Sequence, residues 1–370
     1  MTSTRKSPGD RAVRPGLVVH HSGGIDFGRP VIRWRVGGLS GRWDRREVIV
    51  GTVAALATVV MAIVALGSGD LTVSPMGVVK ALLGTGDPAA ELAIREWQAP
   101  RVLAALAFGA ALALSGAIFQ LLTRNPLGSP DIIGFGVGSY TGALVVTLLF
   151  SGSYLATAGG ALAGGIATAA VVYALAFRQG VGGFRLVICG VAISSMLAAV
   201  NYWLILRADL SEAMSAAQWG AGTLETVTWQ MTTPALCVIV VLITGVAALS
   251  RRHPVFELGP EFGRALGAES RASQIGLPVL GVALTAAATA VAGPIAFISL
   301  SAPHIARRLV GGGRTPLTIT ALIGSLLLVV GDIVAARAFS PRVLPVGVIT
   351  VCLGGIYLCY LLYREMRQEQ

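Results

Sequence analysis

The sequence predicts an all-α protein that crosses a membrane many times. Apolar residues make up 54% of its 370 residues and charged residues only 12%, with a mean hydropathy of +0.75. Soluble domains average about 25% charged residues. The 47 glycines favour the same class, because small residues let transmembrane helices pack closely. Ten long apolar segments complete the prediction of a polytopic protein with ten transmembrane helices.

Residues 1–47 are predicted to be a separate N-terminal tail. They are polar and glycine-rich, with ten Lys and Arg against four Asp and Glu and no sustained helical period. More than half of the net charge of +10 therefore belongs to the tail, and it does not indicate nucleic-acid binding. We expect a basic cytoplasmic tail, disordered in part, followed by one transmembrane domain at 48–370.

Ten apolar segments follow the tail, and Gly293-Pro294 separates the seventh from the eighth. They lie approximately at 48–67, 101–122, 133–150, 154–177, 185–206, 231–249, 272–291, 293–310, 317–338 and 345–363. In the long loop 68–100, Pro75–Leu83 is expected to form a short surface helix. Residues 207–230 are too polar to span a membrane and are expected to cap the outer face.

The distribution of arginine predicts the orientation of these segments. With the tail inside, the inner connections hold Arg124, Arg178, Arg185, Arg251, Arg252, Arg264, Arg271, Arg307, Arg308, Arg314, Arg364 and Arg367. The outer connections hold fewer basic residues, and these are accompanied by acidic ones. Because cytoplasmic loops are enriched in Lys and Arg, both termini are predicted to be cytoplasmic.

The second apolar segment is the most informative stretch of the chain. Val102–Thr123 is uncharged over 22 residues, which is about 33 Å of helix and enough to cross a bilayer. Gly109, Ala113 and Gly116 share nearly one face, so neighbouring helices are expected to approach closely there. Prolines within 125–130 (Asn-Pro-Leu-Gly-Ser-Pro) then stop the helix. Two further glycine series fit close helix packing: Gly134, Gly138 and Gly142, and Gly160 with Gly164.

Ionisable groups are almost absent from the spans. The exceptions are His304, Arg307 and Arg308 near the inner end of the eighth, and Asp332 and Arg337 near the outer end of the ninth. Ion-coupled carriers place such groups near the bilayer midplane. We interpret Asp332 as a helix-end acid paired with a neighbouring arginine, which disfavours an ion-coupled carrier. A membrane scaffold or receptor without transport stays open at this point.

The chain has no motif for ATP hydrolysis or other enzymatic chemistry. A Walker A loop needs a lysine followed by Ser or Thr after a glycine-rich turn, and neither Lys6 nor Lys80 has that context. The sequence holds no GxSxG, HExxH or CxxC, and its four cysteines lie singly in apolar runs. We therefore predict no catalytic, metal or cofactor site on this chain. Any ATPase must be another polypeptide.

Five stretches together resemble the FecCD-type permease subunits of bacterial ABC importers for cobalamin and iron–siderophore complexes. The signature runs from Pro100 to Gly138 and continues in the inner loop from Leu258-Gly259 to Ala265-Leu266-Gly267. It resumes at Gly293–Ile298 with Ala302–Arg307, at Gly331-Asp332 and at Leu344–Thr350. The match covers about residues 50–365, in order. Within the family, the motifs are most similar to ferric-enterobactin permease subunits of the G type.

The resemblance implies a type II ABC importer permease of ten helices in the bacterial cytoplasmic membrane. It also implies a second permease subunit, two cytoplasmic ATPases that use ATP and Mg, and an extracytoplasmic siderophore-binding protein. By the same resemblance, the inner loop at about 251–271 is expected to be the element that couples the chain to an ATPase. Its residues are Leu258, Gly259, Glu261, Arg264, Ala265, Leu266 and Gly267. Asn125, Pro126 and Leu127 fall where family members form a cytoplasmic gate.

The basic residues that would dock the binding protein depart from the family pattern. Arg101 matches an outer-face arginine, but the family's RxPR is Gln98-Ala99-Pro100-Arg101 here, so the first arginine is missing. The candidates for docking are therefore Arg101, Arg95, Arg337 and Arg342. An altered charge set also suits a heterodimer, in which the partner subunit supplies the remaining charges.

The function that this resemblance implies is import of a ferric siderophore, of a catecholate kind similar to enterobactin. A bulky iron complex that crosses between subunits needs a wide, mostly neutral path, and these spans are neutral. Cobalamin and haem are the alternative substrates within the same class. The ion-coupled secondary transporter is the alternative from a different class.

Overall fold

The computed structural model describes residues 19–20, 24–25, 31–36, 39–69, 71–123, 125–131, 133–150, 152–176, 183–250, 271–311, 315–338 and 343–368. Its contacts divide the chain into two units, 1–49 and 50–370. The division falls within the first helix, near the boundary expected between the tail and the transmembrane domain. Each unit is described by itself.

The first unit contains two β-hairpins. Strand β1 (Val19–His20) pairs antiparallel with β2 (Gly24–Ile25), and β3 (Val31–Val36) pairs antiparallel with β4 (Leu39–Asp44). Neither hairpin was predicted from the sequence. In β3, Ile32, Trp34 and Val36 alternate with arginines, which is the period of a strand, and the sequence Gly-Gly that follows is a hairpin signal.

Each of the ten predicted apolar segments corresponds to one helix. The first of these helices crosses from the first unit into the second, and the other nine belong to the second unit. The helices are α1 (Arg45–Leu66), α4 (Ala99–Thr123), α5 (Phe135–Phe150), α6 (Tyr154–Ala176), α7 (Gly183–Arg207), α9 (Trp229–Ser250), α12 (Arg271–Ala292), α13 (Ile298–Val310), α14 (Leu317–Arg337) and α15 (Val346–Gln368). Among the described residues, six helices are long and apolar enough to cross a membrane, namely α1, α4, α6, α7, α9 and α14. Apolar stretches of α5, α12 and α15 are shorter, and α13 has 13 residues.

The short helices follow local capping signals. Helix α2 (Pro75–Leu83) has the predicted bounds, because Ser74 caps its start by accepting the Gly77 N–H, and Gly84 ends it at φ 74°. Helix α3 (Pro88–Leu92) begins at the cap Asp87 and continues through the π-helical segment Ala93–Gln98 into α4. Helix α8 (Leu210–Gly220) lies within the polar connection 207–230.

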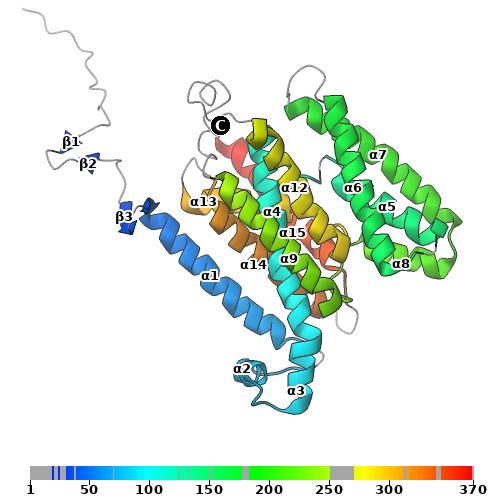
Figure 1. Ribbon diagram of the computed structural model, residues 1–370, viewed down its shortest axis with the longest axis horizontal. Coiled ribbons are helices and arrows are strands. Elements are labelled where there is room, and N and C mark those ends of the chain that lie inside the picture. Colours follow the sequence, from blue (N-terminus) through cyan, green and yellow to red (C-terminus); the bar gives the residue numbers. More distant parts are fainter. Residues whose placement is uncertain are drawn as a thin grey trace, which may run out of the picture. The chain divides into compact units, whose positions relative to one another are not determined.

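Helix α4 is the central element of the second unit. In its most apolar stretch of 18 residues, 78% of the stretch is buried inside the protein, whereas the corresponding share is 17–22% in α1, α6, α7 and α9. It packs against α9, α12, α13 and α14 (Figure 1). The predicted small-residue face makes the closest of these contacts: a Cβ added at Gly109 would collide with the carbonyl oxygen of Gly324, and one at Gly116 with that of Ser299. The expected close approach on this face is confirmed.

The glycine series of α5 and α6 bring these two helices together. An added Cβ at Gly142 would collide with the Gly160 carbonyl oxygen, and one at Gly164 with the Gly138 carbonyl oxygen. Helices α7 and α8 also pack on α5 (Figure 1). The second predicted glycine contact is therefore confirmed, and it forms a backbone-to-backbone seam.

The predicted break at Gly293-Pro294 separates α12 from α13. Gly293 adopts φ 71°, and an added Cβ there would collide with the carbonyl oxygen of Trp219 at the end of α8. The Thr223 N–H also donates to the Ala292 carbonyl at 2.8 Å. The connection that contains α8 thus packs against this break and fixes where α13 can begin.

The glycine seam yields a test within one helix. Gly164→Ala should lower the free energy of unfolding by about 1–3 kcal/mol, the usual cost of overpacking, because its methyl group would meet the backbone of α5. Gly159→Ala is the matched control, since a Cβ there meets nothing within 4 Å. Thermal unfolding of both variants in detergent measures the difference. Equal midpoints would contradict the packing described here.

Candidate functional site

The turn predicted to be a gate lies at the end of α4 and is held by local hydrogen bonds. Asn125 accepts the Leu127 N–H on its Oδ1 at 2.9 Å, and its carbonyl accepts the Gly128 N–H at 2.9 Å. This is an Asx turn followed by a tight backbone turn. Pro126 and Leu127 are exposed, whereas Gly128 packs against the last turn of α4. The tip of the turn is therefore accessible and its base is buried.

The segment that follows this turn is hydrogen-bonded to the start of α13 through the carboxylate of Asp131. Asp131 accepts a hydrogen bond of 2.6 Å from the Ser299 hydroxyl and another from the Phe297 N–H. Asp131 as a residue is half-buried, but its carboxyl group is enclosed by protein atoms. This burial raises the pKa of Asp131 from 3.8 to about 6, although the two hydrogen bonds act in the opposite direction. The carboxyl lies at the N-terminus of α13, the positive end of a helix dipole, which favours its ionised form.

Helix α13 makes three more polar contacts along its length. Gln120 of α4 donates to the Leu300 carbonyl at 3.0 Å and accepts from Arg307 at 2.8 Å. His304 forms a 2.9 Å hydrogen bond with the hydroxyl of Tyr357 on α15. These contacts connect α13 to α4 on one side and to α15 on the other.

Helix α12 is joined to α4 by a buried hydroxyl pair. Ser115 donates to the Gly281 carbonyl at 2.7 Å, and Thr285 donates to the Ser115 hydroxyl at 2.8 Å. Both hydroxyl groups are buried, so each needs such a partner. Because α12 directly follows the predicted coupling loop in sequence, this pair connects the helix after that loop to α4, the helix that leads into the predicted gate turn.

The N-terminal end of α4 is fixed by an ion pair. Arg101 binds Asp332 of α14 through two hydrogen bonds of 2.8 and 2.9 Å, with side chains 15% and 8% exposed. The predicted pairing of Asp332 with an arginine is confirmed, although the partner comes from α4. The arginine nearest to Asp332 in sequence, Arg337, is exposed at the end of α14.

The other predicted docking residues are held separately. Arg95 forms an ion pair of 2.6 Å with Glu91 and donates to the Leu82 carbonyl at 2.9 Å, so it braces α2 against the segment that precedes α4. Arg342 lies outside the described residues, as does the whole predicted coupling set. That set is Leu258, Gly259, Glu261, Arg264, Ala265, Leu266 and Gly267.

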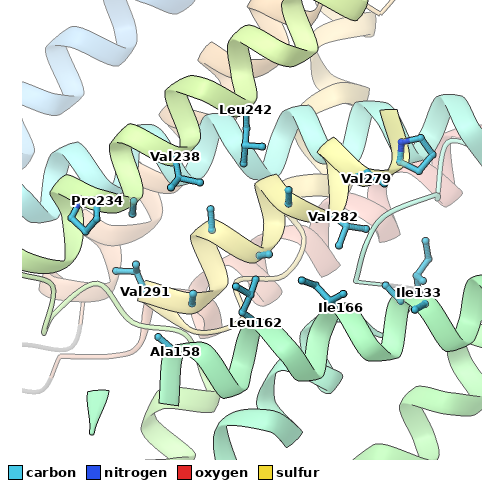
Figure 2. Close-up of a pocket in the computed structure, with 18 of the residues that line it drawn as sticks. Ile133, Ala158, Leu162, Ile166, Pro234, Val238, Leu242, Val279, Val282 and Val291 are labelled. Atoms are coloured by element: carbon cyan, nitrogen blue, oxygen red, sulfur yellow. The ribbon is translucent and has the colours of Figure 1, made fainter. Parts of the chain in front are cut away.

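An apolar cavity of about 1170 Å³ lies between α6, α9 and α12 (Figure 2), and Phe119 and Leu122 of α4 also line it. Leu162 and Ile166 face it from α6, Val238 from α9 and Val282 from α12 (Figure 2). Its few polar side chains include Ser153 and Gln230. Binding sites orient polar ligands with convergent polar groups, so this lining does not suit an iron chelate. In the part of the chain that the structure describes, no group of His, Cys, Asp or Glu could hold a metal ion.

Comparison with known proteins places this arrangement in a family. Residues 54–364 match the FecCD transport family. The chain belongs to that family. It is 46% identical to the ferric enterobactin transport system permease protein FepG of Escherichia coli, over 88% of this chain and 99% of the relative. It is also 37% identical to the cobalamin import system permease protein BtuC of Halobacterium salinarum, over 72% of this chain and 73% of the relative.

A solved structure has the same fold. It is described as an inward-facing conformation of an ABC transporter of the metal-chelate type, and it superposes with a TM-score of 0.76 at 27% identity. The superposition covers 86% of this chain and 99% of that chain. The all-helical membrane fold of the FecCD family is therefore confirmed.

Within this FecCD fold, the sequence located the turn after α4 and the pairing of Asp332 with an arginine, but not the residues that connect the helices. Gln120 and Asp131 stand within the recognised signature, yet no role was predicted for either. Ser115, Thr285 and Ser299 were missed because a hydroxyl in an apolar helix has no sequence signal that identifies its partner. Only the packing of α4 against its neighbours shows which of them bond.

The ion pair at the N-terminal end of α4 gives a testable energy. Arg101→Met or Asp332→Leu alone should lower the free energy of unfolding by about 3–5 kcal/mol, because each leaves an enclosed charge without its partner. The double variant should recover much of that loss. Thermal unfolding of the wild type and all three variants measures the cycle. Additive losses would show that the two side chains do not stabilise each other.

Proposed function

We propose that this chain is the membrane permease subunit of an ATP-driven importer of ferric siderophores, and specifically of a catecholate complex similar to enterobactin. The observation that carries the proposal is the 46% identity to the ferric enterobactin permease of E. coli across nearly the full length of both chains. The aligned region covers 88% of this chain and 99% of the relative, so it contains the helices as well as the turns between them. The chain is then a transport subunit without catalytic chemistry of its own.

In this proposal the chain crosses the bacterial cytoplasmic membrane ten times, with both termini inside. The ten apolar helices and the arginine-rich inner connections support that topology. The tail 1–47 is then cytoplasmic. Crossings by the shorter helices, including α13, would be completed by the non-helical segments that flank them, such as 293–297.

The substrate path is proposed to lie between this chain and a second permease subunit, with a heterodimer favoured over a homodimer. The large cavity within this chain is lined by apolar residues, so it is not proposed as the path of the iron complex. Helices α7 and α15 carry exposed large side chains such as Met196, Tyr202 and Tyr360. Exposed apolar faces of this kind are available for a partner subunit or for lipid.

Two cytoplasmic ATPases that bind ATP and Mg, and an extracytoplasmic binding protein, complete the proposed assembly. The absence of a Walker A motif from the sequence supports a separate ATPase. The ATPase would be coupled through the inner loop at about 251–271, centred on Leu266. The gate would be the exposed tip Asn125-Pro126-Leu127.

The binding protein is proposed to dock on arginines at the outer face. The contacts of these residues rank them: Arg337 is exposed, Arg95 is engaged with Glu91 but 42% exposed, and Arg101 is largely enclosed by Asp332. Arg337 and Arg95 are therefore better placed to meet an acidic partner than Arg101. Arg342 joins this group on sequence grounds.

A cobalamin importer is the second candidate, favoured by the 37% identity to the cobalamin permease of H. salinarum. Haem import has no comparable observation behind it. The ion-coupled secondary transporter loses support because Asp332, the one acid in its span, is engaged by Arg101. Uptake of iron-labelled enterobactin and of cobalamin, in cells with and without this chain, distinguishes the candidates. Loss of cobalamin uptake alone would overturn the siderophore proposal.

Coupling to the ATPase can be tested at Leu266. Leu266→Asp should abolish uptake while the assembled transporter still hydrolyses ATP, because a carboxylate disrupts an apolar docking contact. Met366→Asp serves as the control, since Met366 is 61% exposed near the C-terminus and lies outside the coupling loop. Uptake and ATPase rates are measured in proteoliposomes. Normal uptake by Leu266→Asp would remove Leu266 from the coupling contact.

Docking can be tested at Arg337. Arg337→Glu should weaken capture of the binding protein about tenfold at low salt, with a smaller effect at high salt, because rim charges act mainly on association. Arg207→Glu is the control, since Arg207 is an exposed outer arginine that stacks on Trp203 of its own helix. Surface plasmon resonance over a salt series measures the effect. Equal affinities for the two variants would contradict the role of Arg337.

A further inference from the structure

The start of α13 is unusual in needing a cap from elsewhere in the chain. Its N-cap residue, Phe297, has φ 70°, the one positive φ of a non-glycine residue in the described part of the chain. The side chain of Phe297 offers no capping bond. The first N–H groups of a helix need acceptors, and a carboxylate is favoured there. Asp131 supplies that carboxylate from the turn between α4 and α5.

Asp131 is also attached closely to the tip of the turn. Only Gly128, Ser129 and Pro130 separate it from Leu127, and all three are buried. On its other side, the Gly134 N–H donates to the Asp131 carbonyl at 3.1 Å. The tip is held by bonds within 123–128, so its position relative to α13 depends on where Asp131 is fixed.

Helix α13 is in turn fixed to α15 near the same end. A Cβ added at Gly354 would collide with the Phe297 side chain, which shows that the two helices touch there. The bond between His304 and Tyr357 holds them together one to two turns further on. A displacement of α13 or α15 would therefore be transmitted to Asp131.

We propose that Asp131 is a positioning residue of the cytoplasmic gate, and that its carboxylate on the N-terminus of α13 makes the tip Asn125–Leu127 and α13 move as one unit. This inference rests on the proposed function in naming the tip a gate. Ser299 is the partner through which the carboxylate acts. Opening of the gate then requires either a movement of α13 or the loss of this bond.

The test measures access to the tip without any transported substrate. The four native cysteines are replaced by alanine, and Leu127→Cys is introduced into the full transporter in inside-out membrane vesicles. In the assembled transporter the tip, exposed in the single chain, would face the proposed second subunit when the gate is closed. Maleimide labelling of Cys at position 127 should then be about tenfold faster with Ser299→Ala or Asp131→Ala, equal to about 1.4 kcal/mol in the closed-to-open equilibrium. Asp131→Asn, which keeps an oxygen acceptor, should fall between Asp131→Ala and the parent chain.

Ser301→Ala is the matched control. Ser301 lies two residues further along α13 and is also buried, but its hydroxyl donates to the Phe297 carbonyl of its own helix. Labelling at Met366→Cys, an exposed position near the end of α15, should be unchanged in every variant and reports an intact fold. The double variant Asp131→Ala/Ser299→Ala should label no faster than the faster single variant.

Equal labelling rates for Ser299→Ala and Ser301→Ala would overturn the proposal, and so would additive effects of Asp131→Ala and Ser299→Ala. Because the assay needs neither siderophore nor uptake, it separates this inference from the proposed function. A transporter that imports cobalamin would still show the labelling pattern. One that imports enterobactin without showing it would retain the function and lose the positioning role.

Discussion

Backbone-to-backbone contact at α4 is the constraint on which the rest of the structure depends. At Gly109 and Gly116 the neighbouring carbonyl oxygens of α14 and α13 occupy the space of a side chain. In lipid, helices gain little from hiding apolar surface, so close packing of small residues has to provide much of the attraction. Once the backbones of α4 and α14 are this near, a short side chain such as Ser325 can reach the Leu106 carbonyl on the next helix, at 2.6 Å. The glycines therefore make the polar contacts possible.

These polar contacts define the geometry more narrowly than packing alone. A buried hydroxyl or amide without a partner costs about 1–3 kcal/mol, so each bond penalises helix positions that would break it. Gln120 illustrates this, because its amide satisfies the Leu300 carbonyl and the Arg307 guanidinium together. A small rotation of α13 would disturb both. Interactions of this kind favour discrete arrangements of the helices over gradual sliding, which suits a protein that must alternate between conformations.

Much of the fold followed from composition and periodicity, whereas the pairing of polar groups did not. The apolar segments, the break at Gly293-Pro294 and the α2 helix come from local signals that act within a few residues. Asp332 could be assigned a basic partner from charge alone, but nothing local shows that Arg101 would provide it, 231 residues away. The hairpin of β3 and β4 was missed for a different reason, since the alternation in Val31–Val36 is short and the helical period dominated the rest of the chain. Site residues on the signature were found only where the signature itself marks a turn.

The ion pair at the N-terminal end of α4 also changes how the proposed docking surface has to be understood. A guanidinium held by two hydrogen bonds to a carboxylate that is 8% exposed has little charge left to offer a partner. Replacing Arg101 with an acid would place two negative groups in one enclosed site, so any loss of binding-protein capture would follow from damage to the pairing of α4 with α14. Arg337 is exposed to solvent, so replacing it would not leave an enclosed carboxylate without its partner. The arginine that the family signature marks therefore holds two helices together, and the proposal for docking moves to Arg337, which is exposed at the end of α14.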